Sequence, residues 1–155
     1  MYTVKMLSKS NEIKSALQLA EDVFMQFEAP FFSKRGTESF ISFIWGKNVK
    51  KMLAAGEFVI WGCYSGDVIV GMLALRNDCH ISLAFVRGDF HRQGIGRMLY
   101  AEAGNYASAR NVQKITVNAS DYGIPFYHAM GFKETDMQLE ADGIFYTPME
   151  VIINN

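Results

Sequence analysis

The sequence has few of the residues that cross-link or interrupt a chain. It contains two cysteines, Cys63 and Cys79, and three prolines among 155 residues. Because no second cysteine pair with metal-binding spacing accompanies them, a zinc site is not predicted, and reduced, buried thiols are expected instead. The prolines are spread along the chain and mark no linker, so a single domain over residues 1–155 is expected.

An excess of charge of one sign is also absent. Fifteen Lys and Arg residues oppose sixteen Asp and Glu residues, for a net charge of −1. This balance argues against a general nucleic-acid or membrane-surface binder. No run approaches the roughly 18 apolar residues of a membrane helix, and the opening residues MYTVKMLSKS lack the apolar core of a signal peptide. A soluble, cytoplasmic protein is therefore expected.

Apolar residues are plentiful, at 50% of the chain, and their spacing predicts the elements. Helices are expected at 11–28, 37–45, 47–55, 94–110 and 124–130, with Ser10 or Asn11 capping the first. Strands are expected at 2–7, 57–64, 68–76, 80–86, 114–120, 132–140 and 144–153. This order predicts an α/β fold with a mixed sheet, in which the strands at 80–86 and 114–120 run parallel.

Residues 87–100, RGDFHRQGIGRMLY, place two glycines where the 94–110 helix begins. A helix N-terminus exposes unpaired N–H groups and partial positive charge, and glycines let an anion approach both closely. The N–H groups of Gln93 through Arg97 would converge on a pyrophosphate, flanked by His91 and Arg92. The same glycines also fit a tight turn that only lets the helix pack closely against the sheet.

Two common phosphate-binding motifs do not match. GxxxxGK[ST] is absent, and Leu99 stands where GxGxxG has its third glycine. The sequence instead resembles the GNAT superfamily of acetyl-CoA-dependent N-acetyltransferases, whose signature is [Q/R]xxGx[G/A] between a buried strand and a helix, then a strand and an FYxxxGF-like segment. The matching pieces are HISLAFV, HRQGIG, KITVNAS and PFYHAMGF, within residues 80–132. His91 stands where the family usually has Gln or Arg, but since backbone groups do most of the binding, the cradle is expected to survive.

The resemblance implies a fold and a cofactor site. The fold is a single-domain, GNAT-like α/β fold with a central mixed, largely antiparallel, splayed sheet of about seven strands and about four flanking helices. In the family, the pantetheine arm of acetyl-CoA lies between the two strands that match 80–86 and 114–119. The expected cofactor-binding residues are Leu83, Ala84, Phe85, Val86, His91, Arg92, Gln93, Gly94, Ile95, Gly96, Arg97, Asn118 and Tyr127. No metal is expected.

The resemblance also implies catalytic residues. Tyr127 in PFYHAMGF matches the family's general acid, which protonates the leaving CoA thiolate; a phenol with a pKa of about 10 is neutral at pH 7. The base is open among three residues. His80, which begins the 80–86 strand beside Ser82, titrates in the useful range, and Glu28 and Glu57 are carboxylates that could act through water.

The expected function is N-acetyl transfer from acetyl-CoA to a primary amine of a small molecule or peptide, by direct attack. The amine site is expected between the first two helices, around Glu28-Ala29-Pro30-Phe31-Phe32, and the final strand, at 143–149. A non-catalytic acyl-CoA-binding regulatory module on the same fold is the alternative. A homodimer through the final strands, as relatives often form, is a further expectation.

Overall fold

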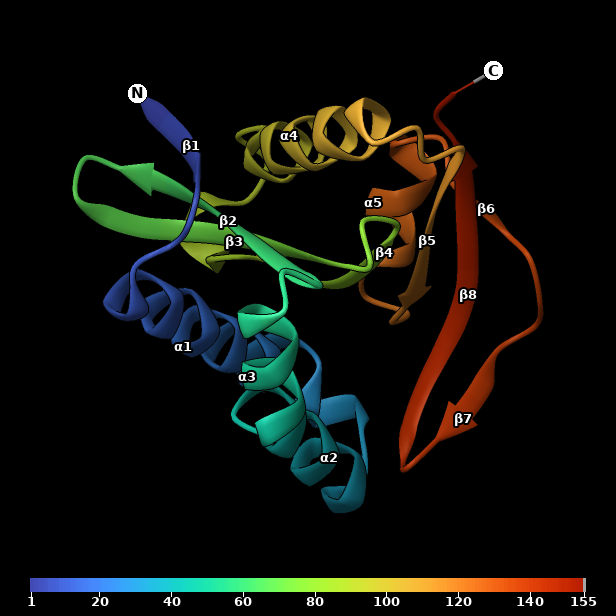
Figure 1. The fold of residues 1–155 in the computed structure, drawn as a ribbon. Helices are drawn as coiled ribbons and strands as arrows, with labels where there is room; N and C mark the ends of the chain where they lie inside the picture. Colours follow the sequence, from blue (N-terminus) through green and yellow to red (C-terminus); the bar gives the residue numbers. More distant parts are fainter. Residues whose placement is uncertain (155) are drawn as a thin grey trace.

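The computed structural model describes residues 1–154, in which a first strand and three helices precede a block of strands and two further helices (Figure 1). The strands are β1 (Tyr2–Met6), β2 (Phe58–Ser65), β3 (Val68–Arg76), β4 (His80–Val86), β5 (Lys114–Ala119), β6 (Lys133–Glu134), β7 (Leu139–Ala141) and β8 (Ile144–Ile152). The helices are α1 (Ser10–Phe27), α2 (Lys34–Ile44), α3 (Lys47–Ala54), α4 (Ile95–Ala109) and α5 (Ile124–Ala129), with 3-10 turns η1 (Ala29–Phe31) and η2 (Gly88–Phe90). No helix within residues 1–154 is both long enough and apolar enough to cross a membrane.

The helices agree with the predicted ranges except where local caps decide their first residue. Helix α2 begins three residues earlier than predicted, because the Ser33 hydroxyl accepts a hydrogen bond from the Gly36 N–H at 3.1 Å. The predicted cap of α1 by Ser10 or Asn11 is wrong. Lys9 occupies the N-cap position, without a side-chain hydrogen bond.

The predicted strand at 132–140 is broken into β6 and β7. Lys133 pairs with Glu150 of β8, and Leu139 pairs with Tyr146 further along the same strand. Every residue from Lys133 to Asp142 is exposed. Without a buried apolar face to hold it on the sheet, the chain leaves β8 between these two short pairings. The sheet therefore has eight strands, one more than the ranges predicted.

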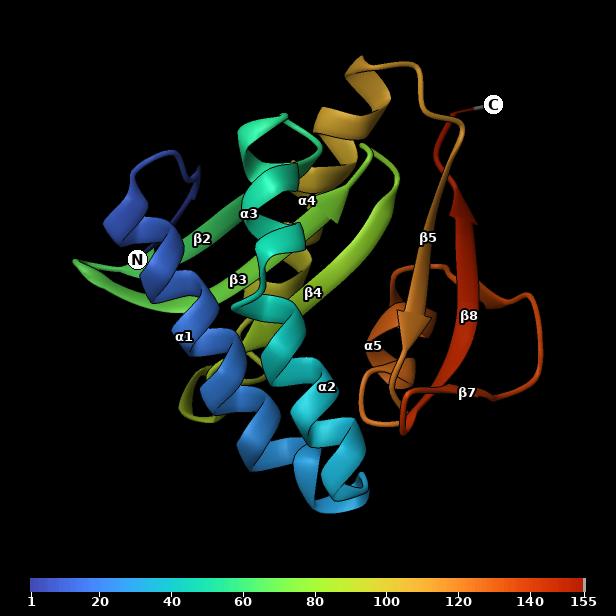
Figure 2. The same ribbon diagram turned by 60° about the horizontal axis from the view of Figure 1, so that its bottom comes forward.

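The strands run in the order β1-β2-β3-β4-β5-β8-β6, with β7 paired to β8. As predicted, the sheet is mixed and largely antiparallel, and β4 and β5 form its parallel pair. These two strands pair only at His80–Thr116 and Ile81–Val117. Beyond Ile81 a bulge in the β3–β4 ladder leaves Ser82 as an extra residue. Because a bulge bends its strand, β4 turns away, and Figure 2 shows it diverging from β5.

Helices cover both faces of the sheet (Figure 1). Helices α1, α2 and α3 lie on one face, where Phe24, Ile44 and Val49 pack against apolar residues of β2, β3 and β4. Helices α4 and α5 lie on the other, where Leu99 and Tyr127 belong to a second apolar cluster. The two clusters meet at the sheet, so the opening between β4 and β5 is bounded by packed helices on each face.

One close contact joins helix α2 to the turn between β7 and β8. A Cβ on Gly36 of α2 would lie 2.2 Å from the carbonyl oxygen of Gly143, in the β7–β8 turn. Beside it, the Ser39 hydroxyl donates to the Asp142 carbonyl oxygen at 2.9 Å, and Arg35 Nη2 lies 3.2 Å from Asp142 Oδ1. Only glycine at both positions lets the two backbones approach this closely.

The crowded backbone at Gly36 and the open space at Gly104 predict opposite effects for two Gly→Ala substitutions. Gly36→Ala should lower stability by about 1–3 kcal/mol, because the added methyl group forces α2 off the β7–β8 turn. Gly104→Ala, in α4, meets no atom within 4 Å and should raise stability by about 0.5–1 kcal/mol through helix propensity. Urea unfolding of both variants checks the pair. Equal stabilities for Gly36→Ala and the native chain would show that this contact does not form in solution.

Candidate functional site

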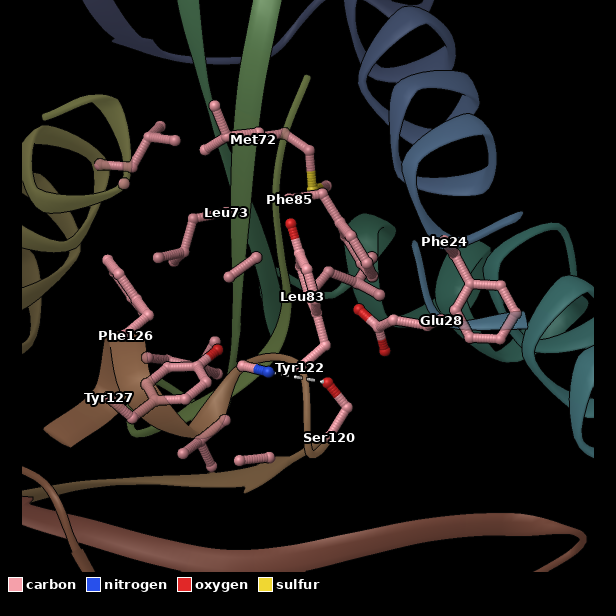
Figure 3. Close-up of a pocket in the computed structure, with 18 of the residues that line it drawn as sticks. Phe24, Glu28, Met72, Leu73, Leu83, Phe85, Ser120, Tyr122, Phe126 and Tyr127 are labelled. Carbon is pink, nitrogen blue, oxygen red and sulfur yellow. Dashed lines mark hydrogen bonds between the residues drawn. The ribbon is translucent and has the colours of Figure 1, made fainter. Parts of the chain in front are cut away.

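The opening between β4 and β5 leads into a cavity of about 640 Å³ (Figure 3). Its walls come from α1 and α2 on one side, from β4, β5 and β8 around the opening, and from the starts of α4 and α5 on the other side. A cavity of this size suits a small-molecule ligand. The residues that line it come from segments far apart in the sequence, from Phe24 to Tyr146.

The first turn of α4 forms one end of the cavity. Its first intrahelical hydrogen bond runs from the Met98 N–H to the Gly94 carbonyl oxygen, so the N–H groups of Ile95, Gly96 and Arg97 have no partner within the helix. No side chain caps this helix. Gly94 has a φ of 80°, and a Cβ there would meet no atom within 4 Å. The N-terminus of α4 is therefore open to an anion.

Gly96 has a different role from the one expected. A Cβ at this position would lie 2.7 Å from Cε1 of Phe126. The space beside Gly96 is thus occupied by an aromatic ring of α5, and the missing side chain lets α5 pack against the start of α4. Of the two glycines, Gly94 leaves room for a ligand, and Gly96 holds Phe126 in the cavity wall.

The His91 side chain ties the end of β4 to the loop after β5. Its Nε2 lies 2.7 Å from the Val86 carbonyl oxygen. Since a carbonyl only accepts, Nε2 carries the hydrogen. Nδ1 lies 3.3 Å from the Tyr122 hydroxyl, and the Phe27 ring stacks on Tyr122 with centroids 5.2 Å apart. The residue that departs from the family pattern thus fixes the loop before α4 through its side chain.

Glu28 brings a carboxyl group into the opposite end of the cavity. It is the C-terminal cap residue of α1, and its side chain points inward toward Ser120 and Tyr122 (Figure 3). Burial raises the pKa of Glu28 to about 7, and a hydrogen bond from the Ser120 hydroxyl partly opposes that rise. The carboxyl group can therefore both hold and release a proton near neutral pH.

Tyr127 lines the same cavity from α5 and is 6% exposed. Its ring packs edge-on against Phe126 and Phe132, and Figure 3 shows its hydroxyl pointing into the cavity. Burial, and then the nearby charge of Glu28, raise the pKa of Tyr127 well above the usual value for a phenol. The hydroxyl keeps its proton at every physiological pH and faces the cavity as a donor.

His80, a second candidate for the base, lies outside the cavity lining. It sits where β4 and β5 still pair, and its Nδ1 is 2.8 Å from the Thr116 hydroxyl. Burial, helped by the positive charge of Arg76, lowers the pKa of His80 to about 4. Glu57 is exposed and also lies outside the cavity lining. Of the three candidates for the base, Glu28 is the one whose carboxyl group lines the cavity.

Most of the predicted cofactor-binding residues lie together. Those that line the cavity are Leu83, Ala84, Phe85, Val86, His91, Arg92, Gly94, Ile95, Gly96, Arg97, Asn118 and Tyr127. Gln93 does not; it is exposed, and its side chain accepts a hydrogen bond from the Tyr2 hydroxyl. Of the residues expected around the amine, Glu28, Phe32 and Tyr146 line the cavity, whereas Phe31 is exposed and does not.

Two groups of lining residues were not anticipated. Ser120 and Tyr122 follow β5 directly, and the rule that sheet sites form at the carboxyl ends of strands could have indicated them. Phe24, Phe40 and Phe43 belong to the apolar stripes of α1 and α2. Their pattern does not distinguish a cavity wall from ordinary core, because both are apolar.

A helix N-terminus open to an anion and two proton-carrying side chains share one cavity in a splayed sheet, an arrangement suited to acyl transfer from a phosphate-bearing carrier. The model of the acetyltransferase (GNAT) domain matches residues 28–153, so the chain belongs to the GNAT acetyltransferase family and is an acyltransferase. No curated protein matches the sequence.

Solved structures share this fold over nearly the whole chain. A GCN5-related N-acetyltransferase from Rhodopseudomonas palustris is similar with a TM-score of 0.78 and 20% identity, covering 96% of this chain and 93% of that one. PaiA N-acetyltransferase from Thermoplasma acidophilum, in complex with coenzyme A, has a TM-score of 0.74 and 16% identity, covering 96% and 98%. The ribosomal-protein-S18-alanine N-acetyltransferase from Escherichia coli has a TM-score of 0.65 and 19% identity, covering 100% and 96%.

Proposed function

We propose that this chain transfers the acetyl group of acetyl-CoA to a primary amine. The observation that carries this proposal is the cavity itself, which has the uncapped α4 N-terminus at one end and both Glu28 and Tyr127 in its walls. Similarity to a structure holding coenzyme A supports the choice of carrier. Acetyl-CoA supplies the activated acetyl group.

The residues present fit coenzyme A. The free N–H groups of Ile95, Gly96 and Arg97 bind the pyrophosphate, and the exposed side chains of Arg92 and Arg97 add positive charge. Beyond Ile81, the edge of β4 that faces β5 has no strand partner. Its free backbone groups, at Leu83 through Val86, bind the pantetheine arm as a neighbouring strand would.

Glu28 acts as the base. An amine must lose its proton before it attacks, and a carboxylate with a pKa of about 7 accepts that proton at neutral pH. Ser120, beside the carboxyl group, stabilises its charged form. His80 serves this role less well, because its pKa of about 4 makes it a weak base and because it does not line the cavity.

Tyr127 acts at the leaving group. Its hydroxyl holds a proton that Oη can donate to the sulfur atom of the departing carrier. The burial that raises the pKa of Tyr127 keeps the hydroxyl protonated until the thiolate develops, so the donor is available at that step. Base and donor thus reach the cavity from opposite walls, α1 and α5.

Ligand-dependent unfolding tests the carrier. Acetyl-CoA and CoA, at a hundredfold excess over their dissociation constants, should each stabilise the chain by about 2.7 kcal/mol. NADH at the same concentration should give no such shift, since the chain lacks the third glycine of the dinucleotide motif. A thermal melt of the chain with each ligand makes the comparison. Equal shifts with NADH, or none with CoA, would contradict the proposed carrier.

The pKa of Glu28 predicts how the rate changes with pH. The kcat/KM for the amine should rise as pH increases through about 7, where Glu28 loses its proton. In Glu28→Gln this rise should disappear, and kcat/KM at pH 7 should fall about a hundredfold. Glu57→Gln is the matched control, because Glu57 is exposed and outside the cavity. An unchanged pH profile in Glu28→Gln would exclude Glu28 as the base.

Unfolding of the same variant checks the pKa independently of activity. The pKa of Glu28 is raised in the folded chain, from 4.5 to about 7. Its carboxyl group therefore favours folding below pH 4.5, and this contribution is lost as pH rises toward 7. Glu28→Gln, measured against the native chain, should gain relative stability across that interval.

Tyr127→Phe should lower kcat about a hundredfold, because the variant keeps the ring and loses the proton donor. The KM for acetyl-CoA should change little, since the ring contacts with Phe126 and Phe132 remain. Tyr100→Phe is the control, as Tyr100 packs on Phe132 outside the cavity. Initial rates of thiol release measure both. Native turnover in Tyr127→Phe would remove Tyr127 from the reaction.

A further inference from the structure

The end of the cavity away from α4 has an aromatic wall, formed by Phe24, Phe32, Phe40 and Phe85. Phe24 stacks on Phe40 with ring centroids 3.9 Å apart and on Phe32 with centroids 5.7 Å apart. Phe85 meets Phe40 edge-on at 5.7 Å. Across the cavity, β8 contributes Phe145 and Tyr146. Rings on both sides suit a flat apolar group.

The same end carries a single formal charge. Among the described residues, Glu28 is the one acidic side chain that lines the cavity. The basic side chains that line the cavity lie in the loop before α4 and in the first turn of that helix; they are His91, Arg92 and Arg97. Glu28 lies four residues after Phe24 on α1, and positions four apart share a helix face. The carboxyl group is therefore set beside the aromatic wall.

A backbone contact also joins two walls of the cavity at this end. The Gly36–Gly143 contact joins α2, which carries Phe40, to the turn that precedes Phe145 and Tyr146. The Ser39 hydroxyl, also on α2, donates a hydrogen bond to the Asp142 carbonyl oxygen in the same turn. The contact therefore ties the α2 wall of the cavity to the β8 wall at this end.

We infer that the acceptor is a small monoamine with an aromatic or similarly flat apolar body, its ammonium group held by Glu28 and its body against the aromatic wall. This inference rests on the proposed function and specifies its substrate class. An ammonium group near aromatic faces gains cation–π attraction in addition to its ion pair. The apolar body gains the free energy of leaving water.

The main competing classes of amine are disfavoured by the same features. A diamine or polyamine would bury a second ammonium group against rings with no carboxylate to pair it. An amino acid would bring its own carboxylate next to Glu28, where like charges repel. A lysine side chain of a protein brings an ammonium group without a flat apolar body for the aromatic wall.

Four amines test the inference with the full chain and acetyl-CoA: 2-phenylethylamine, 1,4-diaminobutane, L-phenylalanine and a short lysine peptide. The expected result is a kcat/KM for 2-phenylethylamine at least about tenfold above each of the others, measured by thiol release. A preference for the diamine, the amino acid or the peptide would overturn the inference and leave the proposed acetyl transfer intact. Thiol release with none of them would contradict the proposed function itself.

Two neighbouring phenylalanines provide a matched pair of variants. Phe32 lines the cavity, whereas Phe31 is 83% exposed and does not. Phe32→Ala should lower the ratio of kcat/KM for 2-phenylethylamine to that for ethylamine about tenfold or more, and Phe31→Ala should leave this ratio unchanged. If Phe32→Ala does not fold, Tyr146→Ala tests the opposite wall in the same way. An unchanged ratio in a folded wall variant would show that the rings do not select the substrate.

Discussion

The structure depends on the limited pairing of two parallel strands. Strands β4 and β5 share two residue pairs before the Ser82 bulge turns β4 away. Backbone polar groups cannot stay buried without partners, so the facing edges must meet water or a ligand. The connection from β4 to β5 runs through α4, and this parallel crossover places the N-terminus of α4 beside the end of β4. The opening and the uncapped helix N-terminus beside it therefore come from one topological feature.

The same opening sets the chemistry of the side chains around it. Glu28 and Tyr127 reach a shared, mostly apolar space from α1 and α5. Burial acts on both acids in one direction, because it disfavours their charged forms, yet the results differ. The pKa of the carboxyl group rises into the neutral range, where it exchanges a proton readily. The pKa of the phenol rises well above physiological pH, so the hydroxyl keeps its proton and remains a donor. One environment thus produces two complementary groups.

Local patterns predicted the parts of the site that depend on the backbone. The glycine turn after the 80–86 strand, the helix that follows and the aromatic segment around Tyr127 are contiguous signals, and they were placed correctly. Which of His80, Glu28 and Glu57 lines the cavity could not be predicted in this way. Each carboxyl or imidazole group has an ordinary pKa in sequence, and only its burial and neighbours distinguish it. The hydrogen bonds of the His91 side chain could not be predicted either, because one partner, Tyr122, lies 31 residues away in the sequence.

The sequence by itself determined the order and type of nearly every element, the family resemblance and the glycine turn at Gly94, because these follow from neighbours a few positions apart. Tertiary structure decided which end of the cavity carries the carboxylate, that Gly96 accommodates Phe126, and that Gly36 meets Gly143 across the opening. It also decided that residues 132–140 form two short strands. These outcomes depend on contacts between distant segments, whose distances and solvent exposure exist only after the chain has folded.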